Sequence, residues 1–439
     1  MSDLSAILDA TRAAGAQQAE AYQVANEEVP VKFEANRLKE LNSRRTSGVA
    51  LRVIADGRVG FASSTRPGDV DDLVEAAMET VPFGPEAHFD FPKQAEAPMV
   101  DTFDPATETF AIDEMIKTGQ TLIDAIRDIE ADLQCDGQVR RLVGTVTLAN
   151  TNGGRYTYRG SMLMLWMHGT LIRGTDMLFV GDVDASASPV LDTKRIIETV
   201  SWQLEHSRRN ATMRTADMPV IFTSTGVADA LVMPLTLAFS GRLVHQGQSP
   251  LAGKLGDALY DQRFSMHDDA TIPMRPASRP FDDEGVASRR IPLVDKGVVR
   301  SFMYDLQTAG LAKTDSTGSA ERSLASQPNI STTSLVVDAG DTTLAEMVSG
   351  VKEGLLVEDL MGAGQGNVMG GDFSGNVLLG YKIENGEIVG RVKDTMVAGN
   401  VHEALANLSA IGSESRWVNG TILTPPLMFE RMAVSAKSE

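Results

Sequence analysis

The most informative part of the chain, from Pro280 to Arg322, reads PFDDEGVASRRIPLVDKGVVRSFMYDLQTAGLAKTDSTGSAER. An acidic triplet at 282–284 precedes a hairpin pattern around Asp295-Lys296-Gly297. A second block, Gly-Gly-Asp-Phe-Ser-Gly at 370–375, is followed by an Asn-Gly pair at 385–386, which is typical of a tight hairpin turn. This density of glycine and hairpin turns predicts a sheet-rich C-terminal half.

The N-terminal half mixes helical and extended patterns. The first helix begins after a cap at Ser2 or Asp3 and stops at Gly15, and further helices are predicted over 70–81, 112–133 and 193–210. Strands are predicted over 20–27, 29–36, 49–55, 58–63, 139–150, 155–167 and 169–183. Because helices and strands do not alternate regularly, the pattern favours an α+β fold over a doubly wound sheet.

A domain boundary is predicted near Asp217. A new strand pattern opens at 218–224, and the motif blocks all lie beyond it. We therefore expect an N-terminal mixed α/β domain over 1–216 and a C-terminal sheet-rich domain over 217–439.

Composition limits the compartment and the partners. The chain has 439 residues and a net charge of −19, which disfavours binding to nucleic acid because phosphate binding needs a basic surface. A single cysteine, Cys135, excludes an internal disulfide and fits a reducing compartment; acidic neighbours predict a raised pKa for its thiol. Neither a signal peptide nor a membrane-spanning run is recognisable, so a cytoplasmic protein without a membrane partner is expected.

Motifs for metal, nucleotide and serine chemistry are weak. No His-Glu-x-x-His occurs, although His245 and His267 could converge in space with Asp268 or Asp269; hydrogen-bonded histidines are the favoured interpretation. The glycine-rich run at 362–367 lacks the following helix of a dinucleotide site and predicts instead a close approach of backbone. Ser374 does not lie in a Gly-x-Ser-x-Gly motif, so no nucleophile elbow is predicted there.

The motif blocks at 280–322 and 370–388, with Ser249–Gly256, resemble the C-terminal region of the TldD/TldE family, also called TldD/PmbA. The resemblance implies two-subunit zinc peptidases of the bacterial and archaeal cytoplasm. Catalytic subunits of that family carry a helix with His-Glu-x-x-x-His and a cysteine ligand near the C-terminus.

The family's zinc ligands have no equivalents here. In the matching stretch, 226–239, the positions of the two histidines and the glutamate are taken by Val232, Met233 and Leu237. The segment 417–426 holds no cysteine. These side chains offer neither a strong zinc ligand nor a carboxylate to deprotonate a metal-bound water. The resemblance therefore points to the non-catalytic TldE/PmbA branch, with no cofactor in this chain and zinc in the partner.

Three functions stay open. The favoured one is an inactive subunit that closes a chamber around unfolded peptides beside a TldD-like catalytic subunit. A second is a homodimeric peptide- or protein-binding module without hydrolysis, and a third is an independent hydrolase with scattered metal ligands. Candidates for a peptide or partner cleft are Asp282, Asp283, Glu284, Arg322, Asp372, Phe373 and Ser374. For the acidic triplet, backbone capping or a salt bridge with Arg289, Arg290 or Arg322 is the favoured structural role.

Overall fold

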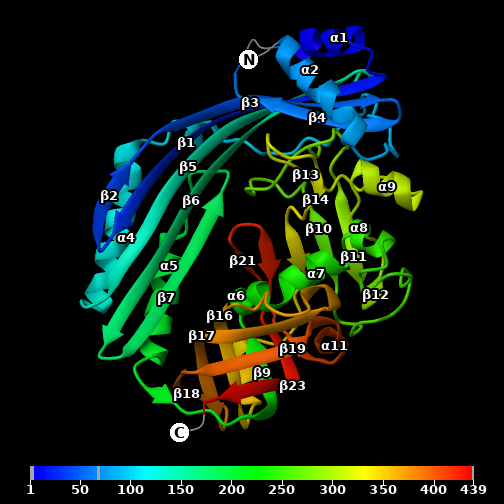
Figure 1. The fold of residues 1–439 in the computed structure, drawn as a ribbon. Helices are drawn as coiled ribbons and strands as arrows, with labels where there is room; N and C mark the ends of the chain where they lie inside the picture. Colours follow the sequence, from blue (N-terminus) through cyan, green and yellow to red (C-terminus); the bar gives the residue numbers. More distant parts are fainter. Residues whose placement is uncertain (1–3, 67–69, 438–439) are drawn as a thin grey trace.

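A long, curved antiparallel sheet forms most of the N-terminal half (Figure 1). The computed structural model describes residues 4–66 and 70–437. The strands of this sheet are β1 (Gln18–Glu34), β2 (Arg37–Leu41), β3 (Arg44–Ala55), β4 (Arg58–Ser64), β5 (Gln134–Asn150), β6 (Arg155–Arg173) and β7 (Asp176–Ser186). They run in the order β4-β3-β1-β5-β6-β7, with β2 paired to β1.

Helices cover one face of this sheet and leave the other face open. The helices of this half are α1 (Leu4–Ala13), α2 (Val70–Thr80), α3 (Pro105–Glu108), α4 (Ile112–Ile129) and α5 (Thr193–His206), with a short 3-10 turn, η1 (Val81–Phe83). Helix α4 buries Met115, Leu122 and Ile126 at helical spacing against the sheet. The uncovered face is concave and turns toward the C-terminal half (Figure 1).

Most predicted elements of this half form, but several bounds differ. Helix α4 ends at Ile129 and α5 at His206, before the predicted ends at 133 and 210, and β2 is an additional strand. The proposed cap at Ser2 or Asp3 lies outside the described residues. The extended segments 20–27 and 29–36 are one continuous strand, β1. The predicted break near residue 168 is wrong: β6 continues to Arg173, and the turn is at 174–175.

Two glycines explain the misplaced turn. Gly174 has φ +66°, which suits the turn between β6 and β7. Gly169 lies inside β6, where a Cβ would come within 2.5 Å of the Leu133 side chain. Gly169 thus marks a close packing contact and does not end a strand.

The C-terminal half contains a small barrel. Its sheet comprises β8 (Asn210–Ala211), β9 (Ala216–Phe222), β16 (Glu353–Met361), β17 (Asp372–Glu384), β18 (Glu387–Val392), β19 (Thr395–Asn400), β20 (Leu408–Ile411) and β23 (Leu427–Ala436). The path β16-β9-β23-β19-β17 closes because β16 also pairs with β17. The loop at 362–367 makes the predicted close approach, since Gly364 bridges Ser374 of β17.

A second sheet lies between the barrel and the end of the long sheet that carries α1 and α2 (Figure 1). It comprises β12 (Val298–Val299), β11 (Arg290–Asp295), β10 (Met266–Asp269), β15 (Leu335–Val337), β22 (Ile422–Thr424) and β21 (Arg416–Val418), in that spatial order. The strands β13 (Ala320–Glu321) and β14 (Asn329–Ile330) form a separate pair, and the remaining helices are α6 (Ser224–Val227), α7 (Met233–Ala238), α8 (Gly241–His245), α9 (Leu306–Ala312), α10 (Leu344–Ser349) and α11 (Val401–Ala406), with a 3-10 turn η3 (Val368–Gly370).

The hairpin turns predicted at 295–297 and 385–386 have the expected geometry. Lys296 and Gly297 have φ of +49° and +79°, and Asn385 and Gly386 have +50° and +83°. Helices and strands are thus segregated as in an α+β protein, which confirms the predicted fold class. The division of the chain at 216/217 stays a prediction.

The apolar stretch 227–239 is not one regular helix. A π-helical turn, η2 (Ala228–Val232), separates α6 from α7. Pro234 is the second residue of α7 and has no N–H to donate to the preceding turn, which accounts for the widening before it. Across residues 4–66 and 70–437, no helix combines the length and apolarity that crossing a bilayer requires.

Candidate functional site

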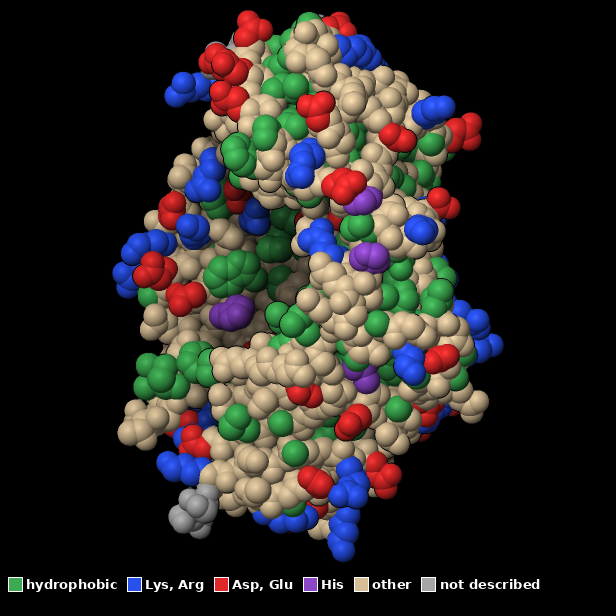
Figure 2. All heavy atoms as spheres, turned by 45° about the vertical axis from the view of Figure 1, so that its right-hand side comes forward, with side chains coloured by type: hydrophobic (Ala, Val, Ile, Leu, Met, Phe, Trp, Pro, Cys, Tyr) green, Lys and Arg blue, Asp and Glu red, His purple; other side chains and the backbone are tan. Residues whose placement is uncertain are grey.

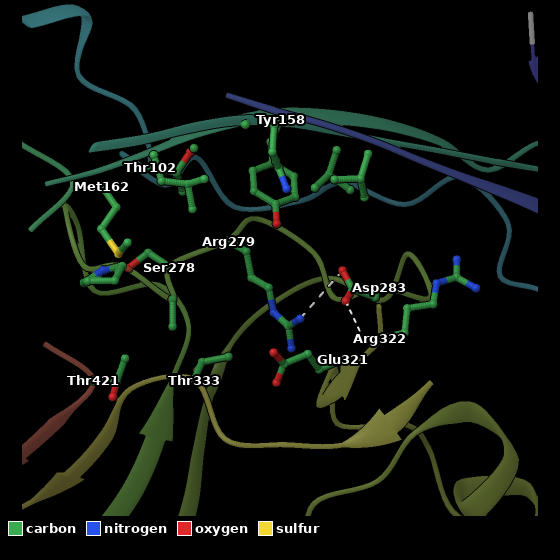
Figure 3. Close-up of a pocket in the computed structure, with 18 of the residues that line it drawn as sticks. Thr102, Tyr158, Met162, Ser278, Arg279, Asp283, Glu321, Arg322, Thr333 and Thr421 are labelled. Atoms are coloured by element: carbon green, nitrogen blue, oxygen red, sulfur yellow. Dashed lines mark hydrogen bonds and ion pairs between the residues drawn. The ribbon is translucent and has the colours of Figure 1, made fainter. Parts of the chain in front are cut away.

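A cavity of about 680 Å³ lies between the concave face of the long sheet and the C-terminal half. Figure 2 shows the molecule hollowed between these two parts, and Figure 3 shows the cavity from within. The long sheet contributes mostly alternate residues of three strands, together with Thr46 of β3 and Ser161 of β6. These alternate residues are Tyr22, Val24 and Asn26 of β1; Leu142, Gly144 and Val146 of β5; and Tyr158, Gly160 and Met162 of β6. The opposite wall is formed by residues 276–279, Asp283, 321–324, 332–333, Thr421, Ile422 and Val232.

The predicted cleft residues are divided between two places. Asp283 and Arg322 lie in the cavity wall, whereas Asp282 and Glu284 are buried beside it and do not line it. Asp372, Phe373 and Ser374 lie on β17 of the barrel, away from these four. A peptide contact by any of the seven stays a prediction.

The Phe373 side chain is in the barrel core. It is 1% exposed and packs edge-on against Phe222 at 6.1 Å between ring centroids. Its neighbour Asp372 accepts a hydrogen bond from the Asn400 side chain at 2.8 Å.

Each carboxylate of the acidic triplet binds backbone N–H groups, which confirms the capping interpretation. Asp282 accepts from the N–H groups of Glu284, Val286 and Ala320 at 2.9–3.0 Å. Asp283 accepts from the N–H of Arg322 at 2.8 Å. The triplet therefore fixes the loop that forms one wall of the cavity.

The remaining hydrogen bonds of the triplet connect it to distant segments. Asp283 also accepts from the Tyr22 hydroxyl at 3.2 Å, and Glu284 accepts from the N–H of Leu306 at 2.7 Å. One residue of the triplet thus reaches the long sheet and another reaches the start of α9.

The salt-bridge partners differ from the predicted ones. Arg289 donates to the Ser316 carbonyl at 2.8 Å, and Arg290 contacts the His267 ring at 3.0 Å. The guanidinium of Arg322 lies 2.8 Å from Glu20. The ion-pair partner of Glu284 is Arg52, at 2.7 Å.

A buried ionic network therefore joins the two halves of the chain. Arg52 of β3 contacts both Glu20 of β1 and Glu284, and the Arg322 guanidinium contacts Glu20 and lies 4.1 Å from the Tyr22 ring centroid. Burial opposes the charge of Arg52, but Glu20 and Glu284 outweigh it and raise its pKa. The network holds the loop at 279–284 against the long sheet.

The three positions that the resemblance assigns to the zinc ligands lie in η2 and α7. Val232 lines the cavity, Met233 is 52% exposed, and Leu237 is half-buried. Two aliphatic groups and a thioether do not supply the nitrogen, oxygen and thiolate donors that zinc sites use. These residues do not fit a zinc ion.

Part of the C-terminal hairpin borders the same cavity. Thr421 and Ile422, from the segment in which the resemblance implies a cysteine ligand, line the same cavity as Val232. In the described part of the chain, no three His, Cys, Asp or Glu side chains are grouped to hold a metal ion. His267 lies against Arg290 and 3.6 Å from Asp338, and the adjacent Asp268 accepts two hydrogen bonds from Thr333.

A pair of carboxyl groups near the cavity has no precedent in the sequence motifs. Asp229 of η2 hydrogen-bonds Asp359, which lies at a bulge in β16. Burial, and then the charge of Asp359, raise the pKa of Asp229 to about 7. The π-helical turn η2 changes the direction of the Asp229 side chain, and the bulge in β16 changes that of Asp359. Together these two irregularities bring the carboxyl groups into contact.

Comparison with known proteins identifies the family. The model of the PmbA/TldA metallopeptidase C-terminal domain matches residues 215–436, and that of domain 1 of the same metallopeptidases matches 19–81. An uncharacterised protein of Methanocaldococcus jannaschii is 25% identical over 421 residues, which cover 94% of this chain and 95% of that protein. A metalloprotease PmbA homologue of Haemophilus influenzae is 26% identical over 302 residues, 66% of this chain and 62% of that one.

A solved structure shows the same fold. The crystal structure of TldE from Thermococcus kodakarensis superposes with a TM-score of 0.89 at 22% identity, covering 99% of this chain and 100% of that one. The α+β frame and the matched domain models define a protein of the metallopeptidase type. The chain belongs to the PmbA/TldD metallopeptidase family.

Proposed function

We propose that this chain is the non-catalytic, TldE/PmbA-like subunit of a heterodimeric cytoplasmic zinc metallopeptidase that degrades or matures unfolded peptides. The observation that carries the proposal is that Val232, Met233 and Leu237, at the positions that the resemblance assigns to the zinc ligands, cannot bind zinc, in a chain that matches the family models over 19–81 and 215–436. A TldD-like partner would supply the zinc, which polarises a scissile carbonyl and activates water.

The contribution of this chain is to enclose and position the substrate. The concave sheet face and the C-terminal half form two walls of a hollow that a partner subunit would close (Figure 2). Walls held by a buried ionic network keep a fixed separation. A chamber of fixed width admits an extended chain and excludes a folded domain.

Backbone recognition suits such a substrate. A peptide that adds as a strand to a sheet edge gains main-chain hydrogen bonds, which do not depend on its sequence. The cavity offers apolar groups of β5 and β6 beside polar groups of the loop at 276–283. This mixture fits peptides of varied composition.

The test is association followed by activity. The purified chain is mixed with a family member that carries His-Glu-x-x-x-His, and the mixture is analysed by gel filtration with light scattering. We expect a stable 1:1 complex that cleaves an unfolded peptide, whereas this chain alone cleaves nothing. Failure to associate with any such partner from the same organism would overturn the proposal.

A homodimeric binding module is the second candidate. In this alternative the cavity itself would bind the peptide, and a second copy of the chain would take the place of the catalytic partner. A stable homodimer that binds peptides, does not hydrolyse them, and ignores the His-Glu-x-x-x-His subunit would select this alternative.

A further inference from the structure

Arg279 is a buried cation with too few partners. It lies in the loop between β10 and β11 and is 6% exposed. Its Nη1 is 3.9 Å from Oδ1 of Asp283, which is a loose contact. Within residues 4–66 and 70–437, Nε and Nη2 have no hydrogen-bond partner. An arginine always carries its charge and five N–H donors, so burial without acceptors is costly.

The carboxylates around Arg279 are already engaged. Asp283 accepts from Tyr22 and from the backbone of Arg322, and Asp282 accepts from three backbone N–H groups. Among the described residues, Arg322 also has guanidinium nitrogens without a hydrogen bond, but it lies 2.8 Å from Glu20 and stacks over the Tyr22 ring. The ion pair of Arg279 with Asp283 is looser, at 3.9 Å, so Arg279 is the less well paired of the two cations.

The guanidinium of Arg279 borders the cavity. Figure 3 shows its side chain extending from the loop toward Asp283 and Glu321, with the Tyr158 hydroxyl directed toward it from the long sheet. Tyr158 packs edge-on against Phe281 at 5.2 Å between ring centroids, and burial raises the pKa of its hydroxyl, which stays a neutral donor. A guanidinium and a phenol thus face one space.

The rest of the cavity limits what kind of anion fits. Leu142, Val146 and Met162 present apolar surface, while Asp283 and Glu321 add negative charge beside Arg279. A dianion such as phosphate would be repelled by these carboxylates, whereas a single carboxylate matches the planar fork of one guanidinium. The apolar walls accommodate an uncharged body attached to that carboxylate.

We propose that this cavity is a carboxylate-binding site, in which Arg279 holds a carboxylate carried on a largely apolar molecule and Tyr158 donates to it. Glu321, which is exposed at the cavity, is the built-in competitor for Arg279. The proposal that the cavity binds a carboxylate depends on Arg279 and not on the proposed function. That the carrier is a peptide rests on the proposed function, and its carboxylate could be the C-terminus or an acidic side chain.

The experiment measures peptide binding to the isolated full-length chain by calorimetry. The probes are an N-acetylated apolar tetrapeptide as free acid, the same peptide as C-terminal amide, and an amide carrying one internal glutamate. We expect the free acid or the glutamate peptide to bind roughly tenfold or more tightly than the uncharged amide, because a charge-assisted hydrogen bond is lost in the amide. The stronger of the two charged probes identifies the source of the carboxylate.

Variants separate binding from folding. Arg279→Gln removes the preference for the charged probes, and Arg279→Lys, which keeps the charge but not the fork, weakens it. Glu321→Gln, at an exposed position, strengthens binding of the charged probes. Arg289→Gln, an exposed arginine of the same segment outside the cavity lining, leaves binding unchanged.

Some results would overturn the inference. The inference is wrong if all three probes bind equally, if none binds, or if inorganic phosphate binds more tightly than acetate. It is also wrong if Arg279→Gln and Glu321→Gln both fold and both keep the same preference for the charged probes over the amide. The experiments can contradict this inference without contradicting the proposed function, and the reverse is also possible. Subunit association without a carboxylate preference contradicts only the inference, and a carboxylate preference without association contradicts only the heterodimer.

Discussion

Arg52 and Glu284 are 232 residues apart in sequence and form a 2.7 Å ion pair in the interior, with side-chain exposures of 3% and 1%. This pair, with Glu20 and Arg322, ties the loop of the acidic triplet to the long sheet. The width of the cavity depends on this connection, because the loop forms one of its walls.

Breaking this pair should destabilise the protein strongly. Glu284→Gln leaves the buried Arg52 with one partner fewer, and loss of one member of a buried pair costs about 3–5 kcal/mol. Urea unfolding followed by circular dichroism measures the change.

The matched control is Glu40→Gln in an exposed pair with Lys32. Exposed pairs contribute about 1 kcal/mol or less, so the midpoint should hardly move. Equal effects of the two substitutions would show that the buried network does not hold the halves together.

The Asp229–Asp359 pair should make stability depend on pH. Burial, and then Asp359, raise the pKa of Asp229 to about 7, so the folded state binds more protons than the unfolded state between about pH 4 and 7. Stability from this pair is therefore present at low pH and lost as pH rises through 7. Asp229→Asn should stabilise the protein by roughly 2–4 kcal/mol at pH 8 and by clearly less at pH 5, because most of the interval between the two pKa values lies above pH 5.

Thermal unfolding at the two pH values measures this difference. The groups that face the pair are Glu358, His168 and the N–H of Leu360. These groups remain in the variant, so the difference in stability between the two proteins reports the titration of Asp229. Asp71→Asn, at an exposed position on α2, is the control and should be neutral at both pH values. A stabilisation by Asp229→Asn that does not depend on pH would contradict the raised pKa of Asp229 in the folded protein.

Gly310 should be intolerant of a methyl group although it lies in helix α9. A Cβ at this position would come within 1.7 Å of the His88 carbonyl oxygen, which is backbone and cannot move aside cheaply. Gly310→Ala should therefore destabilise by about 1–3 kcal/mol, despite the helix propensity of alanine.

Gly350 provides the comparison. It ends α10 with φ −78°, and its nearest atoms would be 3.5 Å from a new Cβ. Gly350→Ala should be neutral or slightly stabilising. Chemical denaturation of both variants tests the contact between α9 and the loop that carries His88, and equal effects would rule it out.

Cys135 should be unreactive in the native protein. Its side chain is 0% exposed, and burial raises the pKa of its thiol to about 11, which confirms the predicted direction. The thiolate is the reactive form, so a thiol reagent at pH 8 should modify the protein only after unfolding. Rapid modification of the folded protein would contradict this burial.

Local patterns predicted most elements of the fold. The helix predicted over 112–133 followed from apolar spacing and forms over 112–129, and the tight turns at 296–297 and 385–386 followed from their Lys-Gly and Asn-Gly sequences. The turn between β6 and β7 was misplaced because a glycine in a packed strand and a glycine in a turn look alike in sequence. Gly169 and Gly174 differ only in what surrounds them.

The site was harder to predict because it is assembled from distant segments. Asp283 and Arg322 were proposed as cleft residues and Val232 as a lost zinc-ligand position, and all three line the cavity. Tyr22 comes to lie beside the strand pair of Tyr158 through the pairing of β1 with the distant β5, which no local pattern specifies. Arg52 was missed because its ion-pair partner Glu284 is 232 residues away. Arg279 directly precedes Pro280 of the motif and could have been considered from sequence, but its lack of partners is visible only in three dimensions.

The central claim is that catalytic zinc is absent from this chain and present in its partner. Metal content by inductively coupled plasma mass spectrometry, on the chain alone and on the complex with a His-Glu-x-x-x-His subunit, tests it most directly. We predict no stoichiometric zinc in the isolated chain and about one zinc per 1:1 complex. Stoichiometric zinc in the isolated chain, accompanied by peptidase activity, would contradict the claim.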